Sequence, residues 1–385
     1  MIRPACLLAL LLALPAAAQT PPAGQGFAIR LYQALDGGTG NLALAPGSVA
    51  AAVALAGMGA EGATQAGMET ALGVNGVAGL DALGAAPGGG VRAANALWVA
   101  RDFTLKARYQ AVAARDFGAK TAGLDFTDGT AAARIINGWV AAHTAGKITD
   151  LVSPATMSAD TRLVLTNAVY FKGSWQVFDK SDTDQQRFHS APGQDETVAM
   201  MHGTGDFVLA QTREAAVLAL PYEGGQAELD VVLPRGEFGL AKLETGLSAA
   251  KLAGWLASAQ AMPVDVSLPR FTVTGNFELS GALSGLGMGR AFDAGHAEFG
   301  GMAVLAPGRR LFISAVLHKA YVTVDETGTE AAAATSVQMT MATAAPPGLA
   351  VTPVAFVADH PFLFIIRALP SGEILFIGRV ESVDG

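Results

Sequence analysis

The stretch VDETGTEAAAAT, residues 324–335, is the part of this 385-residue chain from which the fold is best inferred. It leads into a segment of unusual composition. Residues 331–358 contain no charged side chain and no histidine, and Pro346-Pro347-Gly348 marks part of this segment as a loop. Loops are usually short and polar, and a long one without secondary structure is either functional or disordered. The segment is therefore the first candidate for a functional element.

The first half of this segment alternates with a period of two. Every second residue from Thr329 to Met341 is small or apolar, whereas the intervening positions from Glu330 to Ala342 are polar or small. Such alternation is typical of a β-strand with one buried face. Two simpler interpretations stay open, an alanine-rich helix from Glu330 to about Thr335 and a permanent strand.

The composition of the stretch favours a third interpretation, a loop that can also become a strand. Gly328 has the backbone freedom that a hinge requires. The four alanines at 331–334 have side chains small enough to pass between existing strands. We therefore expect a hinge that begins near Gly328 and Thr329 and is exposed until the segment inserts.

The N-terminus has the features of a secretory signal peptide. Arg3 supplies a positive charge, residues 5–14 form a short apolar run, and three alanines precede Gln19 as a cleavage site. We expect residues 1–18 to be removed and the protein to be exported, to the periplasm or the extracellular space. The single cysteine, Cys6, lies in this segment, so no disulfide or thiolate site is expected in the mature chain.

The charge balance argues against nucleic acid and membranes as partners. The chain has 25 basic and 33 acidic residues, and its net charge of −8 becomes −9 once Arg3 is removed. No cluster of lysine and arginine is present, as nucleic-acid binding would require. After the N-terminus, no apolar run reaches the roughly 18 residues that span a bilayer, so the mature chain is not expected to bind a membrane.

Periodicity and capping signals predict an α+β fold, with helices mainly in the first third. Helices are expected at 48–58 with Ser48 as the cap, 64–72 ending before Gly73, 130–144, 247–259 and 277–286. Residues 163–171 are almost continuously apolar and predict a strand buried on both faces, and shorter strands are expected at 227–233, 264–268 and 321–324. A buried β-hairpin is expected from 360–367 and 374–380.

The motifs of common enzyme classes are missing. The six histidines show neither HExxH nor another metal-ligand spacing, so we expect no metal site and no cofactor. There is no GxSxG nucleophile motif, no phosphate-binding loop with its lysine and no dinucleotide fingerprint after a strand. We expect that the protein is not an enzyme; a secreted hydrolase with a triad assembled from distant residues is left open.

Six stretches spread along the chain resemble the serpin family, and the fifth contains VDETGTEAAAAT. They are NLALAPGSVAAAVALAGMGAEGAT (41–64), INGWVAAHTAGKITDLV (136–152), TRLVLTNAVYFKGSW (161–175), LPRFTVTGNFELSGALSGLGM (268–288), SAVLHKAYVTVDETGTEAAAAT (314–335) and DHPFLFIIRALPSGEILFIGRV (359–380). The resemblance covers about residues 26–383. It implies that residues 19–385 form a single α+β domain of three β-sheets and eight or nine helices, with an exposed reactive loop at about 326–357.

The resemblance implies a suicide-substrate inhibitor of serine proteases. In that family the serine of the protease attacks a bond in the exposed loop and forms a covalent acyl-enzyme. The cleaved loop then inserts into the large sheet as a new strand, and strand insertion of this kind releases stored strain. A serine protease, bound covalently, is thus the expected partner of a chain that is otherwise a monomer. A non-inhibitory serpin with a chaperone or binding role is the alternative.

The resemblance also implies which residues form the hinge and the switch beneath it. Glu326 starts the hinge, which continues through Gly328, Thr329, Glu330, Ala331, Ala332, Ala333, Ala334 and Thr335. Trp175 matches the tryptophan at the point where insertion begins, and Ser48, Asn167 and His318 match a polar cluster under the opening of the sheet. The family commonly has serine where this chain has Ala45, so the cluster loses a hydroxyl.

The scissile bond is implied by distance from the hinge. Sixteen positions after Glu326, as in typical inhibitory members, the bond is Ala342–Thr343, and Met341–Ala342 is the alternative. The surrounding residues are uncharged, which favours an elastase-like or a subtilisin- or chymotrypsin-like protease over a trypsin-like one. The loop is longer than is common in the family, and this leaves Leu349–Ala350 as a rival bond.

Overall fold

The computed structural model of the chain describes residues 23–35, 37–83, 90–329 and 352–383. Nine α-helices occur in these residues: α1 (Ala23–Leu35), α2 (Pro46–Gly57), α3 (Gly62–Leu72), α4 (Gly76–Ala82), α5 (Ala107–Asp116), α6 (Gly129–His143), α7 (Leu240–Thr245), α8 (Ala249–Ala257) and α9 (Ser280–Leu283). None of the helices in the described ranges is long and apolar enough to cross a membrane. The expected signal peptide lies outside the described residues.

The sheet that matters most here has seven strands. Its order is β4 (Lys120–Leu124), β2 (Val91–Ala100), β5 (Leu163–Phe171), β14 (Ile313–Asp325), β15 (Gly328–Thr329) and β6 (Gly173–Ser174), and β12 (Phe271–Glu278) pairs with the other edge of β14. Every residue of β5 is buried, as its almost continuously apolar sequence predicts. We call this sheet the β5–β14 sheet, and the line along which those two strands pair the seam.

Most of the other strands form a nine-stranded sheet. Its order is β1 (Leu42–Leu44), β18 (Ile374–Val380), β17 (Phe362–Ala368), β10 (Ala227–Pro234), β9 (Ala215–Pro221), β8 (Gln194–Gln211), β11 (Gln260–Pro269) and β16 (Val354–Val357), with β7 (Asp184–Ala191) on β8. A two-stranded sheet joins β13 (Ala303–Val304) to β3 (Thr104–Leu105). The α+β class with three sheets, expected from the sequence, is confirmed.

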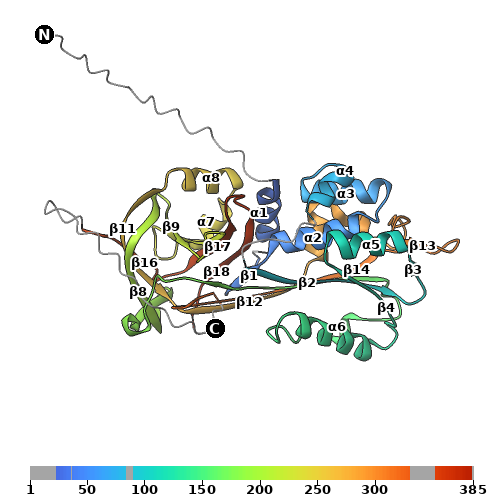
Figure 1. The fold of residues 1–385 in the computed structure, drawn as a ribbon, viewed down its shortest axis with the longest axis horizontal. Helices are drawn as coiled ribbons and strands as arrows, with labels where there is room; N and C mark the ends of the chain where they lie inside the picture. Colours follow the sequence, from blue (N-terminus) through green and yellow to red (C-terminus); the bar gives the residue numbers. More distant parts are fainter. Residues whose placement is uncertain (1–22, 36, 84–89, 330–351, 384–385) are drawn as a thin grey trace, which may run out of the picture.

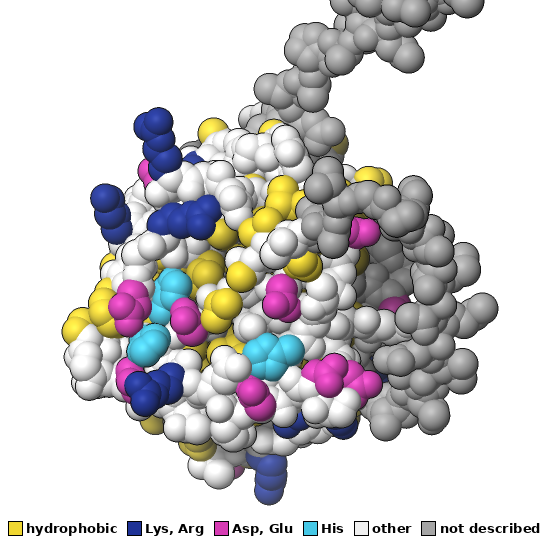
Figure 2. All heavy atoms as spheres, turned by 90° about the vertical axis from the view of Figure 1, so that its left-hand side faces the viewer, with side chains coloured by type: hydrophobic (Ala, Val, Ile, Leu, Met, Phe, Trp, Pro, Cys, Tyr) yellow, Lys and Arg dark blue, Asp and Glu magenta, His cyan; other side chains and the backbone are white. Residues whose placement is uncertain are grey.

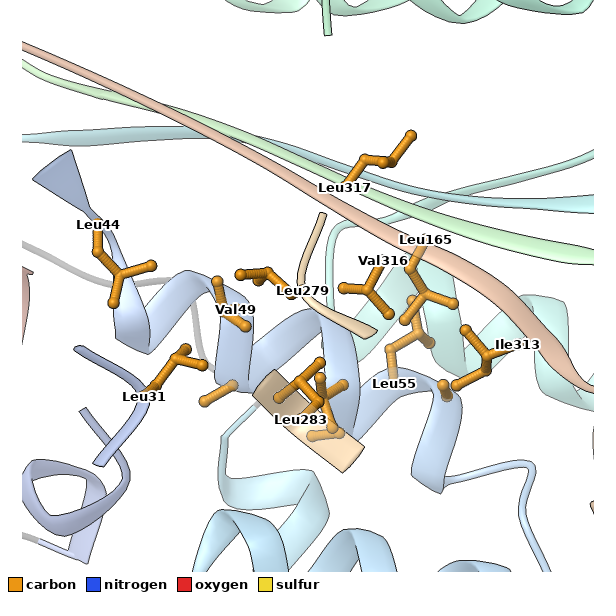
Figure 3. Packing of buried hydrophobic residues seen from close by; sticks show 14 of the residues in the cluster. Leu31, Leu44, Val49, Leu55, Leu165, Leu279, Leu283, Ile313, Val316 and Leu317 are labelled. Atoms are coloured by element: carbon orange, nitrogen blue, oxygen red, sulfur yellow. The ribbon is translucent and has the colours of Figure 1, made fainter. Parts of the chain in front are cut away.

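Helices cover both faces of the β5–β14 sheet. In Figure 1 the sheet runs along the length of the molecule, with α2 and α5 on one side and α6 on the other. Val316 of β14 points toward Val49 and Leu55 of α2, whereas its neighbour Leu317 points to the opposite face (Figure 3). This alternation places successive residues of β14 in two different layers.

Several local predictions are confirmed. The expected hairpin is the antiparallel pair β17 and β18, and all side chains of both strands are buried. Helix α3 ends as expected at Gly73, whose φ of 72° is the left-handed conformation typical of a glycine cap.

Two local predictions are wrong. Ser48 does not cap α2: the helix begins at Pro46, and the buried Ser48 hydroxyl is bonded instead to Asn167 of β5. The helix expected at 277–286 begins only at Ser280, because Phe277 still belongs to β12 and pairs with His318. In both places a contact with a distant strand overrides the local signal.

Candidate strand-insertion site

The seam is closed along most of its length. Strands β5 and β14 pair in parallel register from Leu163 and Ile313 to Tyr170 and Tyr321, without a strand between them. Beyond this point the strands part, and the chain turns back after Asp325. Gly328 and Thr329 then pair with both β14 and β6. The first two residues of the expected inserting strand thus already lie between the separated strand ends.

Gly328 is required by the narrow space between these strands. Its φ is 130°, which side chains of L-residues rarely adopt. A Cβ at this position would lie 2.1 Å from the carbonyl oxygen of Gly173. Glycine is therefore needed here for close approach to β6 as well as for backbone freedom.

Thr329 is fully buried in the intact protein. Its hydroxyl is hydrogen-bonded to the Tyr222 hydroxyl at 2.6 Å, and the ring of Tyr222 stacks on Trp175 at 5.3 Å between centroids. Burial raises the pKa of Tyr222, which remains a neutral phenol. The expectation that the hinge is exposed before cleavage is therefore wrong for Thr329, because its side chain fills a site beneath the sheet.

Trp175 holds the turn that precedes the hinge. Its indole Nε1–H donates to the carbonyl oxygen of Asp325 at 3.0 Å, and its backbone N–H donates to the carbonyl oxygen of Thr327 at 3.2 Å. Trp175 thus contacts the turn directly before Gly328 and Thr329, and its role in insertion stays a prediction.

Glu326 is held by a charged hydrogen-bond network. Its carboxylate is 3% exposed and accepts hydrogen bonds from Arg270, with Nε at 2.7 Å, and from the hydroxyl of Thr183. Burial by itself raises the pKa of Glu326, but the hydrogen bonds from Arg270 and Thr183 outweigh it and the pKa is lowered overall. The hinge start is therefore an anchored carboxylate, fixed on the β12 side of the sheet.

The polar cluster expected under the sheet crosses the seam. His318 of β14 is bonded through Nδ1 to Oδ1 of Asn167 of β5 at 2.6 Å. Asn167 donates through Nδ2 to the hydroxyl of Ser48 at 2.6 Å and to the side chain of Asn95. The His318–Asn167 bond joins the two strands that an inserted strand would separate.

Ala45 stands where the family commonly has serine, and it still contacts the cluster through its backbone. The Ala45 N–H donates to Nε2 of His318 at 3.1 Å. Nε2 is therefore an acceptor, and Nδ1 carries the proton that is donated to Asn167. The imidazole is fully buried and neutral, and burial lowers its pKa to about 3.

The neutral His318 predicts a loss of stability in mild acid. Its pKa in the folded protein, about 3, lies below the roughly 6.5 of an unfolded chain, so its contribution is complete above pH 6.5 and lost as the pH falls. From pH 6.5 to 5 the free energy of unfolding should fall by about 2 kcal/mol through this residue. Urea denaturation of wild type and His318→Gln at both pH values measures it.

The comparison with His318→Gln isolates this effect, because other groups titrate in both proteins. Burial raises the pKa of Asp230 to about 6, and the hydrogen bond that the imidazole of His189 donates to the Asp195 carboxylate raises the pKa of His189. Between pH 6.5 and 5, the free energy of unfolding should fall by about 2 kcal/mol less in His318→Gln than in wild type. Equal drops would show that His318 is not kept neutral by the fold.

Both ends of the expected loop, 326–357, are bound to sheets in the structure. At the far end, β16 (Val354–Val357) pairs in parallel with Val264–Ser267 of β11. The next residues are held too, since the His189 N–H donates to the carbonyl oxygen of Asp359 at 2.7 Å. Figure 2 shows histidine and acidic side chains side by side on this end of the molecule. The loop is therefore shorter than expected at each end.

The remaining site predictions lie outside the described residues and stay predictions. They are the hinge residues Glu330, Ala331, Ala332, Ala333, Ala334 and Thr335, and the reactive-bond residues Met341, Ala342 and Thr343. The hinge residues that the structure does describe, Glu326, Gly328 and Thr329, lie together with Trp175 at the open end of the seam.

Four residues of this site were not predicted from the sequence. Tyr222, Arg270, Thr183 and Asn95 contact the hinge or the polar cluster, although no role was assigned to them. Arg270 does lie in one of the quoted stretches, LPRF, directly after a predicted strand, and that position was the one available signal. Tyr222 is 107 residues away from Thr329 in the chain, so no local pattern could connect them.

Comparisons with known proteins agree with this geometry. The family model described as serpin (serine protease inhibitor) matches residues 22–383. The leukocyte elastase inhibitor of Sus scrofa is 35% identical over 392 residues, which cover 94% of this chain and 99% of that protein. An uncharacterised serpin-like protein of Thermococcus kodakarensis is 38% identical over 370 residues, covering 92% of this chain and 84% of its own.

The solved structures lead to the same family. The crystal structure of Serpin48 from the insect Tenebrio molitor matches with a TM-score of 0.82 and 30% sequence identity, over 94% of this chain and 97% of that one. A family match over nearly the whole length, together with a hinge seated between the ends of β5 and β14, makes the assignment secure. The chain belongs to the serpin family of serine protease inhibitors.

Proposed function

We propose that this serpin is an exported, active inhibitor that traps a serine protease by loop cleavage and strand insertion. The protease serine Oγ attacks the carbonyl carbon of Ala342, an ester bond forms, and the Ala342–Thr343 peptide bond breaks. The amine of Thr343 leaves with a proton delivered by the catalytic histidine of the protease. The freed loop then enters the seam and displaces the protease before water hydrolyses the ester.

One observation carries this proposal. Strands β5 and β14 pair directly along the seam, while the start of the hinge already lies between the strands at one end. Strands β5 and β14 pair directly from Leu163 to Tyr170, so the place of the additional strand is not occupied there. Gly328 and Thr329 are paired with β14 and β6, in the antiparallel direction that a continuing strand needs. Insertion would therefore extend existing pairing and would not have to nucleate it.

The chemistry of the hinge supports an inhibitory role. Thr329 faces the buried side of the sheet beside Tyr222, so the odd-numbered positions that follow it would face the same side in a continuing strand. Those positions as far as Met341 carry only Ala, Thr, Val and Met. No charge would be buried by insertion, and the alternating pattern is the one that a strand with a buried face requires.

The class of the target protease follows from the residues around the proposed reactive bond. The side chains from Met339 to Thr343 are uncharged, and an acidic trypsin-like pocket would gain no ion pair from them. A shallow or apolar pocket accepts Ala or Met. The similar pig protein is named a leukocyte elastase inhibitor, which agrees with an elastase-like target for this chain.

Incubation with four proteases tests the proposal. An elastase-like or a subtilisin-like enzyme should form an adduct that survives denaturing electrophoresis, whereas a trypsin-like enzyme should not. A chymotrypsin-like enzyme should react at Met341–Ala342. For the elastase-like and subtilisin-like enzymes, mass spectrometry should find a released C-terminal peptide that begins at Thr343. The intact mass of the exported chain before reaction should correspond to a start at Gln19.

Other outcomes would change specific parts of the proposal. A released peptide beginning at Ala350 would move the reactive bond to the rival position. Strong inhibition of trypsin would contradict the specificity argument. Cleavage of the loop by every protease without any adduct would favour the non-inhibitory alternative, a chaperone or binding role.

A further inference from the structure

A strand that continues from Thr329 would fit between β5 and β14 without a shift of register. Thr329 pairs with Val324 of β14 on one side and with Gly173 of β6 on the other. These two partners stand opposite each other in the same register in which Tyr170 pairs with Tyr321 along the seam. The position of each later residue of an inserted strand can therefore be counted from Thr329.

The inserted strand would finish at the start of β5 and β14. Counted in this register, Met339 would reach Leu163 and Ile313, the first residues of the two strands. Ala342, which carries the ester to the protease in the function proposed above, would lie three residues further, roughly 10 Å beyond the strand ends. The rim of the protease active site would therefore face the chain segments that surround these strand ends.

Three segments that are distant in the sequence lie together at this end of the molecule. Strand β3 pairs with β13, the Ala100 N–H donates to the carbonyl oxygen of Arg162 at 2.8 Å, and the Lys106 N–H donates to that of Met302 at 3.0 Å. Figure 1 shows β3 and β13 at one end of the molecule, and β8, β11 and β16 at the other. We call these segments the seat and define it as residues 100–108, 158–162 and 304–312.

The seat is basic, although the whole chain has a net charge of −8. It contains six basic and two acidic residues, namely Arg101, Lys106, Arg108, Arg162, Arg309 and Arg310 against Asp102 and Asp160. Because these residues come from three separate parts of the chain, the sequence shows no cluster of them. The positive charge is gathered only by the fold.

Some of these cations keep their charge available for a partner. The Lys106 ammonium donates to the carbonyl oxygen of Gly300 at 2.6 Å, and the Arg162 guanidinium donates to that of Ala159 at 2.7 Å. A carbonyl oxygen satisfies the donor but carries no net charge to neutralise it. Arg310 is likewise bonded to a backbone carbonyl group.

The seat also contains an apolar cleft. The cleft has a volume of about 360 Å³, and Phe103, Val304 and Leu305 contribute to its lining together with Arg309. Val304 is 63% exposed, and the Arg309 guanidinium lies 5.0 Å from the centre of the Phe103 ring while it is paired with Asp102. Apolar side chains and arginine side by side are typical of the centre of a protein–protein interface.

We propose that the seat binds the trapped protease and selects for an enzyme whose active-site rim is acidic. The ester would hold that rim beside the seat, and charge pairs that form across such a contact stabilise a complex. Contacts made here would keep the protease in its displaced position, so the ester is hydrolysed more slowly and less active protease is released. This inference rests on the proposed function, because only insertion carries the ester to this end.

The release of active protease from the purified adduct tests the seat. Adducts are prepared with two elastase-like enzymes, one with an acidic and one with a basic active-site rim, and the returning protease activity is followed at about 0.05 M and about 0.5 M salt. At low salt, Arg310→Gln should release the acidic enzyme about threefold faster, and the double variant Arg309→Gln/Arg310→Gln about tenfold faster. Asp102→Asn frees Arg309 from its ion pair, so it should act in the opposite direction and slow this release about threefold.

A matched control separates the seat from the overall charge of the protein. Arg187 of β7 has a side chain that is 78% exposed and lies 4.0 Å from Asp195, and β7 pairs with β8 at the opposite end of the molecule. Arg187→Gln should therefore release the acidic enzyme at the wild-type rate. The wild-type adducts supply a second measurement that needs no variant, since high salt should accelerate release of the acidic enzyme and should not accelerate release of the basic one.

The outcomes distinguish the seat from the proposed function. If the adducts form and neither salt nor the substitutions in the seat change the release of the acidic enzyme, the seat is wrong and the inhibitor proposal stands. If Arg187→Gln accelerates release as much as Arg310→Gln, only the overall charge matters and the seat is again wrong. If wild type forms no adduct with any protease, both proposals fail.

Discussion

Ala333→Arg is expected to convert this serpin from an inhibitor into an ordinary substrate of its target protease. Ala333 lies four residues after the buried Thr329, so in a continuing strand its side chain would point to the same buried face. Insertion would then bury an unpaired charge at a cost of several kcal/mol. A barrier higher by about 3 kcal/mol slows insertion about 100-fold, so hydrolysis of the ester wins and the protease is released.

The measurement is the fraction of cleaved serpin that ends as adduct, determined on denaturing gels at equal protease. Ala332→Arg is the matched control, because its neighbouring position would face the other side of the strand and should keep most of the adduct. Thr329→Arg is unsuitable as a test, since Thr329 is already buried in the intact protein. Equal adduct yields for Ala333→Arg and wild type would rule out insertion as the trapping step.

Cleavage of the reactive loop is expected to raise the melting temperature by about 10–15 °C. A new strand along the seam would pair its backbone with both β5 and β14 and bury its small or apolar face. About a dozen residues, each contributing on the order of 1 kcal/mol, stabilise the folded state by about 10 kcal/mol. For a chain of this length the unfolding entropy is about 0.8 kcal/mol per degree. Dividing the added stability by this entropy gives the expected shift of the melting temperature.

Differential scanning calorimetry of intact and loop-cleaved protein measures this shift. The cleaved sample should be prepared with a protease that cuts the loop without being trapped, and its two fragments should stay together until they melt. Gly328→Val is the informative variant, because a Cβ at this position would collide with the carbonyl oxygen of Gly173. Identical melting temperatures of intact and cleaved wild type would show that the seam does not accept the loop.

Secondary structure was predictable wherever a local pattern decides it. Residues 163–171 carry apolar side chains almost without interruption, and such a run is stable only as a strand covered on both faces. The hairpin of β17 and β18 is equally local, with two apolar runs and a short turn. The prediction failed at Ser48 and at Phe277, where contacts with β5 and β14 replaced the helix signals.

The sequence by itself determined the alternating pattern of the hinge and the presence of a conformationally free glycine at its start, because both are properties of neighbouring residues. Only the tertiary structure decided that Thr329 is buried and that Glu326 is anchored. Tyr222 reaches Thr329 across 107 residues and Arg270 reaches Glu326 across 56, and such contacts exist only once the sheets have formed. Burial and hydrogen bonding of a side chain depend on partners that the local sequence does not contain.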